Sequence, residues 1–281
     1  MKTSELKETL TTYKNNDFQM DESINIQELT TAMLREIGNV DPVLRDELIY
    51  RSFCQMILQD FYSDKELKEI VNTCMDHQHL FYNIGESGTD SVFKRSFSSL
   101  IIAVILHVNL QKNFLSTDDI QVVYESLLSY VDLEQDVRGL VPGKGWGHSV
   151  AHVADAIDEL VKQPSLDSGD FEVIFASIIK KMTFNKDYFN YDEDERMVIP
   201  LVEMLQRGIN QSIVCEKTSD LANNIKDGFS TGNQSYFIYR SNVKKFLSSL
   251  YFHLDMKEQH TDVQETIKQA LLKINQPYYQ M

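Results

Sequence analysis

The chain has 281 residues, of which 42% are hydrophobic and 25% are charged, a composition ordinary for a soluble globular protein of one large or two small domains. Its formal net charge of −15 repels nucleic-acid phosphates and anionic lipid surfaces, so the composition argues against nucleic-acid and membrane partners. Only 11 glycines and 5 prolines are present. Because sheet-rich folds use many such residues in turns, their scarcity favours helices.

The sequence also predicts where the protein resides. Residues 1–16 lack the apolar core of a secretory signal. The most apolar run, Leu100–Leu106, is shorter than the about 20 residues that span a bilayer, so it indicates a buried helix. Cys54, Cys74 and Cys215 do not follow the spacing of a metal site. We therefore expect free, buried thiols in a reducing cytoplasm.

Helical periodicity, with apolar residues three and four positions apart, recurs along nearly the whole chain. Ser63 with Glu66 forms a predicted capping box, and Ser116 is a second predicted N-cap. Pro200 is expected to kink or split its helix, and no segment shows convincing strand alternation. In chain order we expect helices over residues 24–37 and 41–61, after Ser63, after Asp90, after Ser116, from the glycine-rich stretch to about Val161, and over 170–182, 192–209, 212–225, 235–254 and 260–274.

This pattern predicts an all-α fold of roughly a dozen helices, arranged as a HEAT-like α/α superhelix (solenoid). Arginines near helix starts or in a loop recur at intervals of about 40 to 60 residues, close to the length of a helix pair, although five of 27 basic residues can look regular by chance. We expect one domain over 1–281, with an N-terminal helix or arm over 1–23, a core over 24–255 and a C-terminal helix over 256–281. The recurring arginines are Arg45, Arg95, Arg138, Arg196 and Arg240.

The stretch RGLVPGKGWGHSVAHVADAIDEL, residues 138–160, holds the only tryptophan and two histidines four residues apart. It is not a Walker loop, because only three residues separate Gly139 from Gly143 and a glycine follows Lys144. A looser anion site remains open, in which backbone amides at the start of the following helix act with Lys144 and Arg138.

In that helix, His148, His152, Asp155 and Glu159 fall on one narrow stripe. Two histidines one turn apart with a carboxylate at i+7 can bind a divalent metal, so His148, His152 and Asp155 are candidate metal ligands. The same histidines, held by Asp155 or Asp136, are candidate catalytic bases. The plain alternative is the polar face of an amphipathic helix.

Three further expectations concern single residues and a cluster of acids. We expect Trp146 to anchor the buried side of the 148–161 helix, opposite the histidine stripe. We expect His107, which lies within the apolar run, to be a core histidine. The acids of residues 190–196 complement the positive end of a helix dipole.

Five segments together resemble a family of bacterial proteins known as the domain of unknown function numbered 2785, from near residue 24 to about 255. Glu134 to Asp155 is the most specific part, and Gly147 stands where the family pattern leads us to expect alanine. The resemblance implies an all-helical, HEAT-like superhelix, mostly from the cytoplasm of Gram-positive bacteria, and no settled activity. The segments are DPVLRDEL (41–48), VFKRSF (92–97), EQDVRG (134–139), GKGWGHSVAHVADAIDEL (143–160) and EDERM (193–197).

Two hypotheses of function follow. In the first, a polar groove binds a small anionic or metal-bearing ligand, with hydrolysis as one option and a divalent metal as the candidate cofactor. In the second, the protein is a non-enzymatic scaffold for a protein partner, and the polar cluster is a structural ion-pair network. The groove of the first hypothesis would be lined by Asp136, Arg138, Lys144, Trp146, His148, His152 and Asp155, with Glu193 and Arg196 from a later helix pair.

Overall fold

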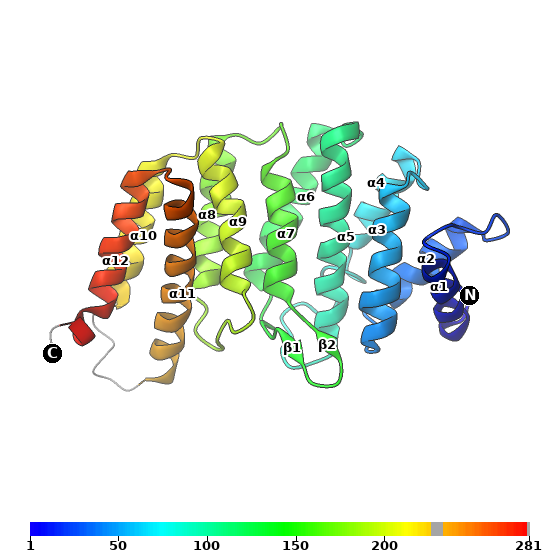
Figure 1. Ribbon diagram of the computed structural model, residues 1–281, viewed down its shortest axis with the longest axis horizontal. Helices are drawn as coiled ribbons and strands as arrows, with labels where there is room; N and C mark the ends of the chain where they lie inside the picture. Colours follow the sequence, from blue (N-terminus) through cyan, green and yellow to red (C-terminus); the bar gives the residue numbers. More distant parts are fainter. Residues whose placement is uncertain (226–232, 280–281) are drawn as a thin grey trace. The chain divides into compact units, whose positions relative to one another are not determined.

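Helices make up most of the computed structural model, which describes residues 1–225 and 233–279 (Figure 1). These residues form twelve α-helices, one π-helical segment and one two-stranded ribbon, so the all-α prediction is confirmed. The chain divides into two compact units, Met1–Leu160 and Val161–Met281. The prediction of a single domain stays a prediction.

The first unit contains helices that pack around one long apolar helix. That helix, α5 (Ser91–Lys112), contacts both α3 (Arg51–Leu58) and α4 (Asp64–Cys74). The remaining elements of this unit, in chain order, are α1 (Thr3–Asn15), α2 (Ile26–Glu36), the π-helical η1 (Val43–Tyr50), α6 (Thr117–Leu133), β1 (Leu140–Val141), β2 (Gly145–Trp146) and α7 (Ser149–Val161), whose last residue is assigned to the second unit.

The second unit is a set of helices that pack on their sequence neighbours and near neighbours. Helix α11 packs against both α9 and α12, and α10 packs against α12. Residues 280 and 281, the end of the predicted C-terminal helix, lie outside the described residues. The helices are α8 (Ser168–Met182), α9 (Glu193–Gln206), α10 (Gln211–Ile225), α11 (Gln234–Lys257) and α12 (Thr261–Tyr279).

Among the described residues, α5 is the one helix long and apolar enough to cross a membrane by length and composition. However, 83% of its most apolar window is buried inside the protein, as in the core helix of a soluble protein. Its apolar residues therefore serve packing within the first unit, as the sequence predicts for Leu100–Leu106.

Local sequence signals set the helix starts. The hydroxyl of Ser63 accepts from the Glu66 amide at 3.4 Å, and the Glu66 carboxylate accepts from the Ser63 amide at 2.8 Å. Ser116 and Asp119 repeat this reciprocal arrangement, with distances of 3.2 and 2.9 Å. Both predicted N-caps are confirmed. They could be predicted from the sequence because capping needs only residues three positions apart.

Three local features differ from the sequence prediction. The helix expected over 41–61 begins with the π-helical η1, and α9 continues through Pro200 without being split. The glycine-rich stretch also contains the ribbon β1–β2, which is too short to show strand alternation.

The caps give a first test of this local analysis. Replacing the exposed N-cap in Ser116→Ala leaves the Asp119 amide without its acceptor, so we expect the free energy of unfolding of the first unit to fall by about 1 kcal/mol. Urea denaturation followed by circular dichroism measures it. Ser23→Ala, in an exposed loop, is the control and should change stability little; equal effects of the two substitutions would contradict the capping assignment.

Candidate functional site

A buried ion pair lies at the centre of the predicted polar cluster. Arg95 of α5 and Glu134, the residue after α6, are 0% and 1% exposed. The guanidinium donates to both carboxylate oxygens, Nε to Oε2 at 2.6 Å and Nη2 to Oε1 at 2.8 Å. Burial alone lowers the pKa of Arg95, but the hydrogen bonds to Glu134 raise it above the usual value. The guanidinium of Arg95 is therefore held by this carboxylate inside the protein.

The remaining donors of Arg95 hold the loop before α5. Nη1 donates to the Ser91 hydroxyl at 2.7 Å and to the carbonyl oxygens of Tyr82 and Asn83 at 3.1 and 3.3 Å. Nη2 also donates to the carbonyl oxygen of Glu86 at 3.3 Å. Every guanidinium N–H thus has an acceptor, which leaves no donor for a ligand.

Asp136 extends the network by one step. It is fully buried, and its Oδ2 accepts from the Gly88 amide at 2.9 Å and from Arg138 Nη2 at 2.6 Å. Its Oδ1 accepts from Arg138 Nε at 2.8 Å, and these bonds raise the pKa of Arg138. Arg138 Nη2 also donates to the Thr89 carbonyl at 2.7 Å. Asp136 and Arg138 are therefore brought together as predicted, but each bonds the other and the loop.

The ribbon β1–β2 follows this network. Leu140 pairs with Trp146 and Val141 with Gly145, and residues opposite each other in an antiparallel pair point to the same face. Val141 is buried with Val92 and Phe93, so the Val141–Gly145 face packs inward. The Leu140–Trp146 face points outward, with these residues 44% and 40% exposed.

Arg45 holds the turn of the ribbon from its inner face. Its guanidinium lies over the Phe93 ring, with Cζ 4.1 Å from the ring centre, and its Nη2 donates to the Lys144 carbonyl at 2.7 Å. Gly145 has φ +78°, and a Cβ there would lie 2.8 Å from Pro42 Cβ and 3.0 Å from Arg45 Nη2. Only glycine allows the ribbon to approach Arg45 this closely.

The two histidines form an aromatic stack beside the ribbon. His148 lies outside α7, with φ +46°, and stacks on Trp146 at 4.4 Å between ring centres. His152 lies edge-on to it at 5.6 Å and to Phe97 at 5.1 Å. The predicted metal stripe is thus packed against aromatic rings.

Hydrogen bonds fix the tautomer of His152. Ser96 Oγ donates to the Gly147 carbonyl, which can only accept. Ser96 Oγ therefore accepts from His152 Nδ1 at 2.6 Å, and the neutral ring carries its lone pair on Nε2. Ser96 also ties α5 to the end of the ribbon.

The other predicted site residues lie in different places. Lys144 Nζ contacts both carboxylate oxygens of Asp90 at 2.7 Å. Asp155 lines a groove with residues of α3 and α5 whose lining includes none of the other predicted site residues. Glu193 belongs to the second unit, where it is fully buried at the start of α9 and burial raises the pKa of its carboxyl. Arg196 lies on the same helix, and the prediction that these two share a groove with His148 stays a prediction.

Within residues 1–225 and 233–279, no three His, Cys, Asp or Glu side chains are grouped so that they could hold a metal ion. The structure thus does not gather His148, His152 and Asp155 into a metal centre. The three cysteines are free, as predicted, although only Cys74 is buried.

Two sequence predictions are wrong. Trp146 does not anchor the buried side of a helix, because it lies in β2, before α7 begins at Ser149, and is 40% exposed. His107 is not a core histidine: its side chain is 50% exposed and its Nδ1 lies 3.2 Å from Glu159 Oε2.

Sequence reasoning missed the roles of Arg95, Glu134 and Ser96. Arg95 and Glu134 are 39 positions apart, so no local spacing joins them. The sequence offers one signal for each of these two: Arg95 is a charged residue inside the apolar pattern of α5, and Glu134 is an acid directly after α6. At Gly147 an alanine Cβ would lie 2.9 Å from the Arg138 carbonyl, so here the expected alanine would require the backbone to shift.

Comparison with known proteins places this arrangement in a family. Residues 80–252 match the family described as "Protein of unknown function (DUF2785)". The chain belongs to this family. The match covers more than half of the chain and includes Arg95, Glu134, Asp136 and the ribbon, so the predicted resemblance is confirmed. No curated protein and no solved structure matches the chain.

The buried ion pair yields a second prediction. Glu134→Gln leaves the Arg95 charge buried without its carboxylate, so we expect the free energy of unfolding to fall by about 3–5 kcal/mol. Asp90→Asn removes the carboxylate of the exposed Lys144 pair and should cost less than about 1 kcal/mol. Urea denaturation of the two variants makes the comparison. Equal losses of unfolding free energy would show that the buried Arg95 pair contributes no more to stability than the exposed Lys144 pair.

The ribbon's close approach yields a third prediction. Gly143 and Gly145 both have positive φ, but a Cβ at Gly143 meets nothing within 4 Å. Gly143→Ala should cost about 1 kcal/mol of stability from backbone strain alone. Gly145→Ala should cost about 1–3 kcal/mol more, because Pro42 and Arg45 must move. Thermal unfolding of the pair measures the difference, and identical midpoints would refute the packing argument.

Proposed function

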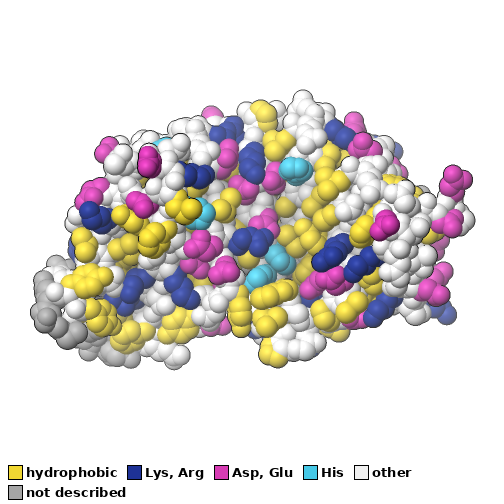
Figure 2. Space-filling model, in the orientation of Figure 1, with side chains coloured by type: hydrophobic (Ala, Val, Ile, Leu, Met, Phe, Trp, Pro, Cys, Tyr) yellow, Lys and Arg dark blue, Asp and Glu magenta, His cyan; other side chains and the backbone are white. Residues whose placement is uncertain are grey.

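We propose that the protein is a non-enzymatic binding protein, and that the outer face of the ribbon β1–β2 contacts a protein partner. The observation that carries this proposal is that the solvent face of the ribbon is apolar. That face carries Leu140 and Trp146, both more than one-third exposed. Figure 2 shows hydrophobic side chains on the surface over the ribbon. Exposed apolar patches on soluble proteins frequently mark interaction sites.

Tryptophan suits this role in particular. Trp, Tyr and Arg dominate the residues that contribute most to protein–protein binding, because one large, stiff side chain fills a pocket of the partner. Trp146 is already oriented by its stack on His148. Leu140 lies directly opposite it in the ribbon, which gives a contiguous apolar pair.

The buried network supports the same role by holding the ribbon. Asp136 and Arg138 fix its first strand, Arg45 bonds the Lys144 carbonyl in its turn, and Ser96 bonds the Gly147 carbonyl after its second strand. A surface ordered before binding loses less conformational entropy when the partner docks.

The alternative of a small anionic ligand has less support. Arg138 and Lys144, the cations expected to receive it, are engaged by Asp136 and Asp90. An anion would have to displace these carboxylates, and the carboxylate that remained would repel it. Hydrolysis is equally weakly supported: Ser96 gives its one proton to the Gly147 carbonyl and accepts from His152 Nδ1, so in this arrangement His152 cannot activate Ser96 as a nucleophile.

The partner we propose is a basic protein. The chain carries a formal net charge of −15, which attracts a positively charged partner at long range and repels an acidic one.

A HEAT-like arrangement of the helices and a bacterial cytoplasmic location are parts of the same proposal, based on the arginine spacing and the family resemblance.

Binding through the ribbon gives a fourth prediction. Proteins retained by the immobilised chain are identified, and a basic candidate is purified and titrated while the emission of Trp146, the only tryptophan, is recorded. Burial of the indole should shift the emission to shorter wavelength. Leu140→Ser should weaken the affinity at least about tenfold, or 1.4 kcal/mol.

Val122→Ser is the matched control, because Val122 is a 50% exposed apolar residue of α6 in the same unit. Its affinity should equal that of the unchanged chain. If Leu140→Ser binds as tightly as Val122→Ser, or if the Trp146 emission does not move on binding, the ribbon is not the contact surface.

A further inference from the structure

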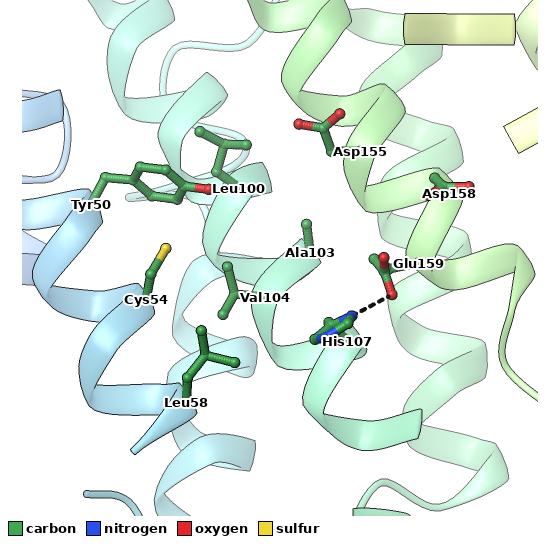
Figure 3. A pocket seen from close by; sticks show the side chains of 10 residues that line it. All are labelled: Tyr50, Cys54, Leu58, Leu100, Ala103, Val104, His107, Asp155, Asp158 and Glu159. Atoms are coloured by element: carbon green, nitrogen blue, oxygen red, sulfur yellow. Dashed lines mark hydrogen bonds and ion pairs between the residues drawn. The ribbon is translucent and has the colours of Figure 1, made fainter. Parts of the chain in front are cut away.

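A polar pocket in the first unit lies where the end of α2 and the loop between α4 and α5 meet the start of α5. Its volume is about 490 Å³, within the range of small-molecule sites, about 300–1,000 Å³. Lys94 of α5 lines this pocket. The groove drawn in Figure 3 differs in this respect, because none of its ten lining residues is a lysine or an arginine.

Close packing and a hydrogen bond place the side chain of Lys94. A Cβ at Gly38 would lie 2.5 Å from the Cβ of Lys94 and 2.7 Å from its Cα, so only glycine allows the chain after α2 to approach α5 this closely. At the far end of the side chain, Nζ donates to the Arg35 carbonyl at 2.9 Å and lies 5.7 Å from the centre of the Tyr82 ring. Arg35 and Tyr82 also line the pocket, so the amine lies at the pocket wall.

The amine of Lys94 has no carboxylate partner among the residues that the structure describes. It forms no ion pair there, and its one hydrogen bond goes to a neutral carbonyl oxygen. Three carboxylates line the pocket, but each of them bonds other groups. Glu36 accepts from Asn39 Nδ2 at 2.8 Å, Glu86 Oε2 lies 2.9 Å from the hydroxyl oxygens of Thr89 and Ser91, and Asp90 pairs with Lys144 at 2.7 Å.

This environment increases the neutral fraction of the amine. Burial is the largest influence on Lys94 and lowers its pKa, although the carboxylates of Glu36 and Asp76 act in the opposite direction. A neutral amine can donate one N–H to the Arg35 carbonyl and still present its lone pair to the pocket. A lysine in this state is a nucleophile toward a carbonyl carbon.

We propose that this pocket binds small hydroxylated aldehydes and that Lys94 holds them as an imine. The nitrogen lone pair attacks the carbonyl carbon, a C=N bond replaces the C=O bond, and the carbonyl oxygen leaves as water with the two hydrogens of the amine. The reaction is reversible and needs no oxidant or reductant. Hydroxyl groups on the ligand suit the polar lining, where the side chains of Gln78 and Tyr82 form no hydrogen bond within the described residues.

The pocket is separate from the surface proposed to contact a protein partner. Its lining contains no residue of the ribbon β1–β2, so either proposal can fail without the other. Covalent binding of a small molecule at Lys94 is thus a second activity, at a residue that the sequence analysis does not single out as a site.

Glyceraldehyde with sodium cyanoborohydride tests the proposal, because the reductant converts each imine into a stable secondary amine. The folded chain is treated and then digested, and peptide mass spectrometry measures the rate of modification at each lysine. Lys14 is the internal reference: it is also partly buried, but it is paired with Glu47 at 2.9 Å and lies outside the pocket. Propanal, which has the same carbon chain without the hydroxyls, is the control probe.

We expect glyceraldehyde to modify Lys94 at least about tenfold faster than Lys14, because Lys94 has no ion pair and lies in a pocket that holds the aldehyde. With propanal the ratio of the two rates should fall about fivefold, the effect of one lost hydrogen bond. Tyr82→Phe, which removes only a hydroxyl, should lower the ratio for glyceraldehyde about fivefold and leave that for propanal unchanged. Tyr188→Phe, at an exposed tyrosine outside the pocket, should leave both ratios unchanged.

Three results would overturn the proposal. Modification of Lys94 no faster than that of Lys14 would show that the pocket favours no imine. Equal rate ratios with glyceraldehyde and propanal would show a reactive lysine that does not recognise hydroxyl groups. The same glyceraldehyde ratio in Tyr82→Phe as in the unchanged chain would show that the polar lining does not bind the aldehyde.

Discussion

The buried Arg95–Glu134 ion pair is the interaction on which the order of the loop before α5 and of the ribbon depends. Removing two charges from water costs several kcal/mol per ion, and that cost is offset only when every polar atom finds a partner. Here the carboxylate receives two guanidinium N–H bonds and the Asp136 amide, and the other guanidinium donors bond Ser91 and three carbonyl oxygens. The pair thereby joins α5, the loop before it and the end of α6 at one point.

From this pair, order extends outward to the surface. Asp136, two residues after Glu134, bonds both the Gly88 amide and Arg138, and the ribbon follows directly. Arg45 and Ser96 hold its turn and its end. A stretch with four glycines between residues 139 and 147, which would be mobile in isolation, becomes a fixed platform for Leu140 and Trp146. The buried charged residues hold the ribbon in place, and the apolar face of the ribbon is exposed to solvent.

The sequence predicted the helices well because their signals are local. Apolar spacing and the serine caps need only residues three or four positions apart, and most helices begin and end within a few residues of the prediction. Asp136 and Arg138 could be paired from the sequence for the same reason, since they are two positions apart. The ion pair between Arg95 and Glu134 could not be predicted, because 39 positions separate the two residues and only the folded chain brings them together.

The error at Trp146 has a physical cause. The prediction treats Trp146 as part of the same helix as His152, but His148 has positive φ and interrupts the helix, so the helical faces do not apply to the residues before it. His107 was misassigned because an apolar run can still have one side at the surface. In both cases the direction of the side chain depends on tertiary packing, which the helical period alone does not give.

Hydrogen exchange of individual amides in Asp136→Asn tests most directly whether the network holds the ribbon. If it does, exchange accelerates at Gly88, whose amide bonds Asp136, and at Gly147 and His148, whose amides bond the carbonyls of Gly139 and Arg138. Amides of α1 and α2 should keep their rates. Unchanged protection at Gly147 and His148 would contradict the claim that the buried charges organise the exposed face.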